Sequence, residues 1–130
     1  MSFLLALVLI LGGCVSESVP EGMDRETLLS SGQQVLLLMV EGDYEAIHSL
    51  LREDQRAQTS VEDIRKAIED QLCDAGLYKQ IEDRMVTSLT KEGEHYGVAV
   101  MYCEFSEEDV LIRAFFDTQM RLVGFALQQD

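Results

Sequence analysis

The 130-residue sequence is poor in basic residues, with ten Lys and Arg against 24 Asp and Glu and a formal net charge of −14. Nucleic-acid binding needs clustered basic side chains, and such side chains also bind anionic lipid headgroups. The charge therefore excludes both kinds of electrostatic partner. We expect no nucleic-acid partner, and a membrane would have to hold this chain by something other than its surface charge.

Motifs of catalysis and metal binding are also missing. The two histidines, His48 and His95, have no second His or Cys at metal-ligand spacing. There is no Gly-rich phosphate loop and no nucleophile elbow. The acidic group at 104–109 lacks the alternating pattern and central Gly of a calcium loop. We expect no catalytic residues, no metal and no cofactor.

The one long apolar run is residues 3–11, FLLALVLIL. It is too short to cross a bilayer, which takes about 20 residues, but it has the length of the apolar centre of a secretory signal. Leu11-Gly12-Gly13-Cys14 follows and resembles the lipobox of bacterial lipoproteins. The resemblance implies lipidation of the Cys14 sulfur and cleavage before Cys14. Acyl chains anchor a protein by about 0.8 kcal/mol per buried CH₂.

These features divide the chain into a signal peptide at 1–13, a lipidated tether at 14–22 and a domain at 23–130. The tether is polar, holds the only proline, Pro20, and is expected to lift the domain off the bilayer. No Lys or Arg precedes the apolar run, although signal peptides have a basic start, and an upstream start codon would supply one. The alternative is an N-terminal core helix with a buried free cysteine.

Periodicity predicts the secondary structure of the domain. Apolar residues at helical spacing predict a helix from Asp24 to Gly42, a short helix Tyr44–Leu51 with Ile47, Leu50 and Leu51 inward, a loop Arg52–Thr59, and a third helix from the capping box at Ser60 to Gly76.

Alternation with a period of two begins at Tyr78. It predicts a long strand with Ile81, Met85, Thr87 and Leu89 on one face, and then strands Tyr96–Phe105, Asp109–Asp117 and Arg121–Gln128. Short turns between successive strands predict an antiparallel meander. Helices followed by strands define the fold class as α+β: three N-terminal helices, then a four-stranded antiparallel meander curved around a helix.

Four segments carry a family resemblance. They are Glu41-Gly42-Asp43-Tyr44, the helix capped at Ser60, Gly76-Leu77-Tyr78, and Ala114-Phe115-Phe116-Asp117 with Leu122-Val123-Gly124-Phe125. In these segments Val40–Gln128 resembles a family of uncharacterised lipoprotein domains of Gram-positive bacteria, which is similar to the nuclear-transport-factor-2-like, or cystatin-like, superfold. The resemblance implies a curved sheet around a long helix, with a pocket between sheet and helices, and carries no reaction.

Two further groups of residues are candidates for a site. Cys73 on the third helix and Cys103 on the second strand could form a disulfide outside the cytoplasm, but we favour two separate buried thiols. Tyr78, Tyr96, Tyr102 and Arg113 are candidates to line the pocket, and cross-strand packing is the alternative.

The sequence therefore predicts a lipoprotein on the outer face of the cytoplasmic membrane. Its domain is expected to be a non-catalytic module that binds a small ligand or an envelope protein. One alternative is a small pocket enzyme, of isomerase or hydrolase type, which rests on analogy with the superfold alone. The other is a structural accessory subunit that forms a homodimer through its sheet.

Overall fold

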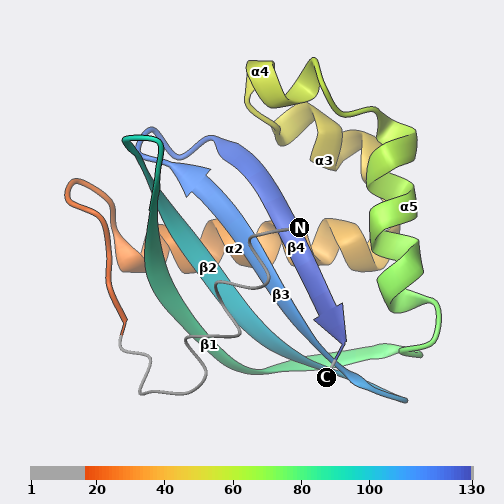
Figure 1. Cartoon of the computed structure of the whole chain (residues 1–130). Coiled ribbons are helices and arrows are strands. Elements are labelled where there is room, and N and C mark those ends of the chain that lie inside the picture. The colour runs from red at the N-terminus through yellow and green to blue at the C-terminus, as the bar shows by residue number, and fades with distance from the viewer. Residues whose placement is uncertain (1–16, 130) are drawn as a thin grey trace.

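The computed structural model describes residues 17–129, so the predicted signal peptide and Cys14 lie outside the described residues. Its elements follow one another as helices α2 (Arg25–Glu41), α3 (Tyr44–Leu50), α4 (Glu53–Arg56) and α5 (Val61–Leu72), and strands β1 (Tyr78–Lys91), β2 (Glu94–Phe105), β3 (Asp109–Asp117) and β4 (Leu122–Gln129). This order, helices before strands, confirms the α+β class (Figure 1).

The four strands form one sheet in the order β1-β2-β3-β4, and each neighbouring pair is antiparallel. The predicted meander is thus confirmed. Its first turn is Glu92-Gly93, where both residues have positive φ (52° and 82°). Two positive φ values define the type I′ turn, whose twist matches that of the flanking strands.

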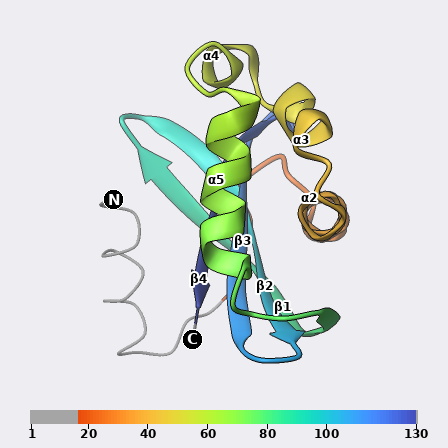
Figure 2. The same cartoon turned by 90° about the vertical axis from the view of Figure 1, so that its right-hand side faces the viewer.

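Helix α2 packs across one face of the sheet, as Figure 2 shows. Asp24 caps its first turn by accepting from the Thr27 amide, and Gly42 ends it in the left-handed conformation (φ 75°). Gly32 brings the helix very close to β2, because a methyl group built on Gly32 would lie 2.4 Å from the Ala99 Cβ. The core of the domain lies between this helix and the sheet face that carries Ala99, Met101, Ile112 and Ala114.

Helices α3, α4 and α5 lie beyond β4, on the far side of the sheet from β1 (Figures 1 and 2). The predicted capping box of α5 is present, since Ser60 and Asp63 each bond the other's backbone amide. Leu51, directly after α3, forms a parallel bridge with Leu122 of β4. This bridge and the α5–β4 contacts hold the helices against the edge of the sheet.

Four sequence predictions need correction. Ile81 pairs with Cys103 on the α2 face, whereas Met85 pairs with Val100 on the other, because a register shift after Ile81 reverses the alternation. Leu50 is 45% exposed rather than inward, because the short α3 turns only Ile47 fully into the core. The predicted loop contains the single helical turn α4. The third helix ends at Leu72, before Gly76.

The residues before α2 lie along the outer edge of β1, where Figure 1 shows them as the red-to-orange segment. The Ser18 amide donates to the Val86 carbonyl (3.1 Å), and the Val86 amide donates to Glu17 Oε2 (3.0 Å). The described part of the predicted tether is therefore docked on the sheet. None of the helices within residues 17–129 is long and apolar enough to cross a membrane.

Candidate functional site

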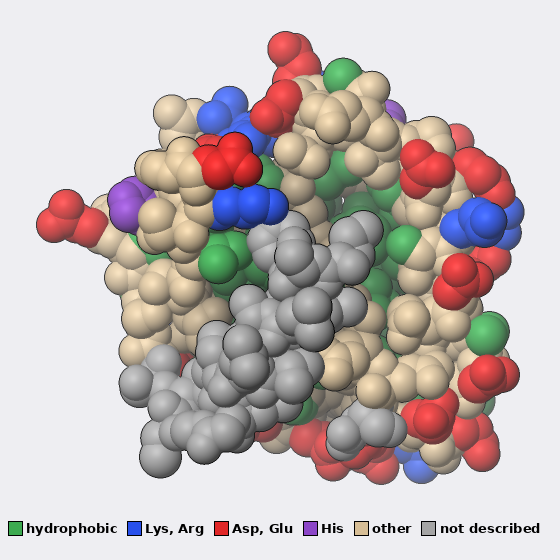
Figure 3. Space-filling model, in the orientation of Figure 1, with side chains coloured by type: hydrophobic (Ala, Val, Ile, Leu, Met, Phe, Trp, Pro, Cys, Tyr) green, Lys and Arg blue, Asp and Glu red, His purple; other side chains and the backbone are tan. Residues whose placement is uncertain are grey.

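A pocket of about 700 Å³ opens between β4 and α5 and continues over the sheet face that α2 leaves uncovered. We call it the β4–α5 pocket. Hydrophobic side chains line a hollow in this region of the surface, beside the helices at the right of Figure 3. The volume lies within the range of small-molecule sites, about 300–1,000 Å³.

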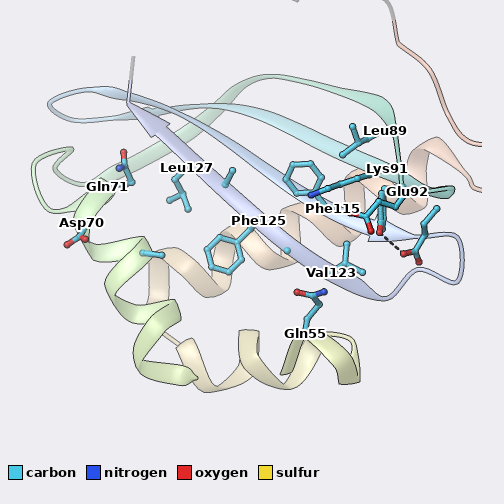
Figure 4. A pocket seen from close by; sticks show the side chains of 15 residues that line it. Gln55, Asp70, Gln71, Leu89, Lys91, Glu92, Phe115, Val123, Phe125 and Leu127 are labelled. Carbon is cyan, nitrogen blue, oxygen red and sulfur yellow. Dashed lines mark hydrogen bonds between the residues drawn. The ribbon is translucent and has the colours of Figure 1, made fainter. Parts of the chain in front are cut away.

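The apolar wall of the pocket curves around β4. Phe115 pairs with Gly124 and so faces away from α2, whereas Phe125 pairs with Ala114 on the α2 face. Figure 4 shows Phe125 and Leu127 extending towards the helices, with Leu89 and Phe115 on the other side of the strand. Gly124 leaves space in the middle, since a Cβ built there would meet nothing within 4 Å.

Polar side chains surround this apolar wall. Gln55 comes from α4, Asp70 and Gln71 from α5, and Lys91, Glu92, Glu94 and Tyr96 from the ends of β1 and β2 and the turn between them. Apolar walls with a few polar groups at the rim are the usual make-up of a small-ligand site. Among residues 17–129, no group of His, Cys, Asp and Glu is arranged to hold a metal ion.

An ion-pair cluster around Arg52 adjoins the pocket through Glu94, which is one of the lining residues. Arg52 makes two hydrogen bonds to Asp54 (2.8 and 2.9 Å), one to Glu94 (2.6 Å) and one to Asp117 (3.2 Å). The Asp117 side chain is only 4% exposed, and it also accepts from the Arg121 side chain (2.9 Å). The cluster joins the α3–α4 connection to β2 and to the turn between β3 and β4.

Hydrogen bonds shift the pKa values of this cluster away from neutrality. The bond from Arg52, and then that from the Tyr96 hydroxyl (2.5 Å), lowers the pKa of Glu94. The same hydrogen bond between Tyr96 and Glu94, followed by burial, raises the pKa of Tyr96. Burial opposes ionisation of Asp117, but hydrogen bonds from Arg121 and Arg52 outweigh it and lower that pKa. These carboxylates are therefore ionised at neutral pH, held as acceptors rather than as proton donors.

Of the four residues predicted to line the pocket, only Tyr96 does so. Tyr78 packs edge-on against Phe105 with 5.5 Å between ring centroids, and Tyr102 is 37% exposed. Arg113 is 2% exposed, and its Nη2 donates to Gln128 Oε1 (3.0 Å), while Nε has no hydrogen-bond partner within residues 17–129. Cross-strand packing thus accounts for Tyr78, as the alternative prediction had it.

The histidines and the two described cysteines lie outside this pocket. His48 is part-buried and its Nε2 lies 2.7 Å from the Thr59 carbonyl, and His95 contacts Thr90. Both cysteines are free thiols. Cys103 is buried, but the prediction of a buried thiol is wrong for Cys73, which is exposed at the C-terminal end of α5. Desolvation, and then the charge of Glu82, raises the pKa of Cys103 to about 12.

The fold and the pocket define a small α+β domain in which a long helix covers one sheet face and three short helices flank the last strand. The chain belongs to the family described as "Protein of unknown function (DUF3887)", whose profile matches residues 32–125. It is similar in structure to a protein from Ruminococcus gnavus ATCC 29149 determined by NMR (TM-score 0.72, 23% identity, 88% of this chain and 99% of that chain covered). At this identity the likeness establishes the fold alone. A search of the curated proteins gives no match.

The Arg52 cluster was not predicted from the sequence. Arg52 and Asp54 stand in the predicted loop, and Glu94 and Asp117 at strand ends, so their spacing gives no motif. The available signal was charge, because Asp117 directly follows the apolar residues Ala114-Phe115-Phe116 and needs a partner if it is buried.

Proposed function

We propose that this protein is an extracytoplasmic lipoprotein, anchored to the cytoplasmic membrane through Cys14, whose domain binds a small apolar ligand without catalysing a reaction. The observation that carries the binding function is the β4–α5 pocket, with about 700 Å³ lined by Leu89, Phe115, Phe125 and Leu127. Such a pocket favours apolar ligands because burying apolar surface contributes about 25 cal/mol per Å².

The electrostatics of the pocket support binding rather than catalysis. A general acid or base works best with a pKa near the operating pH. Glu94 and Tyr96 line the pocket, and their pKa values are shifted down and up respectively. Each shift moves the group further from neutral pH.

The anchor rests on the sequence, since the lipobox-like Leu11–Cys14 follows an apolar run of signal-peptide length. The arrangement of a bent sheet, a long covering helix and a pocket also supports our finer assignment to the nuclear-transport-factor-2-like, or cystatin-like, superfold of Gram-positive lipoprotein domains. Members of a superfold need not share a function, so the assignment adds nothing to the choice of ligand.

Phase partitioning in a detergent tests the anchor. The full-length chain made in a Gram-positive host should enter the detergent phase, and Cys14→Ser should stay in the aqueous phase. Cys73→Ser is the matched control and should partition like the wild type, because Cys73 is an exposed free thiol of the domain. Partitioning of Cys14→Ser with the wild type would rule out a lipid on Cys14.

Filling the pocket tests the binding function. Gly124→Leu should place a side chain in the open space at Gly124 and reduce binding of the fluorescent apolar probe phenylnaphthylamine at least tenfold. Gly124→Ala is the matched control and should bind nearly as well as the wild type. Equal binding by all three proteins would place the probe elsewhere and contradict the assignment of this pocket.

A further inference from the structure

The stem, which we define as residues 17–23, is fixed to the domain at both ends. At its start, Val86 of β1 exchanges hydrogen bonds with it, donating to Glu17 Oε2 and accepting from the Ser18 amide. At its end, Met23 packs on the core, and a Cβ built on Gly97 would lie 3.1 Å from the Met23 Cε. A chain held at two points does not act as a free spacer.

Side chains strengthen the attachment at the start of the stem. Glu17 forms an ion pair with Arg25 of α2 (3.0 Å), and the Ser18 hydroxyl lies 2.6 Å from that of Ser88 on β1. Glu17 therefore joins three segments: the stem, the first turn of α2 and the edge of β1. The hydrogen bond from Arg25, followed by that from the Val86 amide, lowers the pKa of Glu17. Glu17 therefore carries the negative charge of this ion pair at neutral pH.

Little chain remains between this attachment and Cys14. Glu17 is three residues after Cys14, and three extended residues span at most about 11 Å. A folded domain of this size is roughly 35 Å across. When a point on its surface is held within 11 Å of a bilayer, that point has to face the bilayer, because the rest of the domain would otherwise overlap the lipid.

From this we infer that the docked stem holds the domain edge-on to the membrane, with the outer edge of β1 innermost and α5 outermost. The inference rests on the proposed lipid anchor at Cys14. Three strand spacings separate β1 from β4, which is about 14 Å, and α5 lies beyond β4 (Figure 1). The α5 wall of the β4–α5 pocket therefore faces the aqueous side, where soluble molecules reach it.

The stem also covers part of a sheet edge. An edge strand with free amides and carbonyls invites pairing with a second chain. At Val86 both backbone groups are already bonded to the stem. We therefore also infer that β1 does not pair with a second copy at Val86 while the stem is docked.

Energy transfer to the bilayer tests the orientation. The full-length lipidated chain is placed in phosphatidylcholine–phosphatidylglycerol vesicles that carry a headgroup acceptor dye. A donor is attached through Glu82→Cys on β1 or through Lys66→Cys on α5, in a Cys73→Ser background. We expect at least twofold more transfer from the β1 position. Equal transfer from both positions on vesicle-bound protein would overturn the orientation while leaving the anchor intact.

Releasing the stem is the second arm of the test. Glu17→Ala combined with Ser18→Pro removes the acceptor for the Val86 amide and the donor to its carbonyl, so the difference between the two label positions should disappear. Glu21→Ala, in the same stem, is the matched control and should keep the difference. Val86 amide exchange should accelerate in the released protein only. A chain that never binds vesicles would overturn the anchor and this inference together, and an unchanged difference after release would overturn the role of the stem.

Discussion

Asp117 is a buried carboxylate at the turn between β3 and β4. Its Oδ1 accepts from the amides of Gln119 (3.0 Å) and Arg121 (2.9 Å), and its Oδ2 accepts from the Arg121 and Arg52 side chains. One buried carboxylate thereby shapes the turn between β3 and β4 and pairs a nearly buried guanidinium. Such charges are stable in a protein interior only when they are fully hydrogen-bonded.

Asp117→Ala should lower the free energy of unfolding by about 2–3 kcal/mol, because it leaves two amides and part of Arg52 without an acceptor. Urea unfolding measures the loss. Asp54→Ala is the control, since the Asp54 side chain is 54% exposed and an exposed ion pair contributes about 0–1 kcal/mol. Similar losses of unfolding free energy for both variants would show that the burial of Asp117 does not increase its contribution to stability.

The contribution of Asp117 should also depend on pH. Its pKa in the folded protein is lowered from the ordinary value of 3.8, so the ionised form stabilises the fold above that value and the contribution fades as the pH falls through the lower, folded pKa. The difference in unfolding free energy between wild type and Asp117→Ala should thus be constant from pH 7 to about 5 and shrink below about 3.8. A difference that persists at pH 2 would contradict an ionic role.

The two described thiols should differ sharply in reactivity. Iodoacetamide should alkylate Cys73, which is exposed, and spare Cys103, whose burial raises its pKa to about 12, until the protein is unfolded. Mass spectrometry after labelling of the native, lipidated protein reports the result, and Cys73→Ser should then take no label. If neither thiol reacts until a reductant is added, the two form a disulfide and the free-thiol description is wrong.

At the scale of elements, the contact of α2 with the sheet depends on a residue without a side chain. Gly32→Ala should destabilise the domain by about 1–3 kcal/mol through overpacking against Ala99, although alanine favours helices by about 1 kcal/mol. Thermal or urea unfolding tests this, with the exposed Gln34→Ala of the same helix as a control near zero. A more stable Gly32→Ala protein would mean that α2 lies further from β2.

Local signals made most of these elements predictable. Asp24, Gly42 and the Ser60–Asp63 capping box mark helix ends through their own backbone neighbours, and two-residue alternation with short turns is sufficient to predict a meander. The reversed face of Ile81 was not predictable, because it depends on how β1 pairs with β2. The exposure of Leu50 likewise depends on which face of α3 packs against the rest of the domain.

The site was predictable only in outline. The resemblance implied a pocket between sheet and helices, and the β4–α5 pocket has that position. Its lining residues escaped prediction because they come from six elements and a turn that approach one another only in the folded chain. Tyr96 was one of the four residues predicted to line the pocket, whereas Phe115 and Phe125 appeared only in the segments that carry the family resemblance.

At the scale of the whole molecule, charge, stem and pocket suit a domain held close to a membrane surface. A net charge of −14 keeps the domain from adhering to anionic lipids, so the proposed lipid on Cys14 would be its one firm attachment. The docked stem would then fix which edge faces the bilayer and leave the α5 wall of the pocket towards the aqueous phase.

Native mass spectrometry of the full-length chain, released gently from the membranes of a Gram-positive host, examines the lipid anchor and the bound ligand in one measurement. We expect a chain that begins at Cys14 and carries acyl chains, with a small-molecule adduct that Gly124→Leu abolishes and Gly124→Ala retains. A chain without acyl mass would rule out the lipid anchor. No adduct on the wild type, or the same adduct on all three proteins, would rule out a ligand in the β4–α5 pocket.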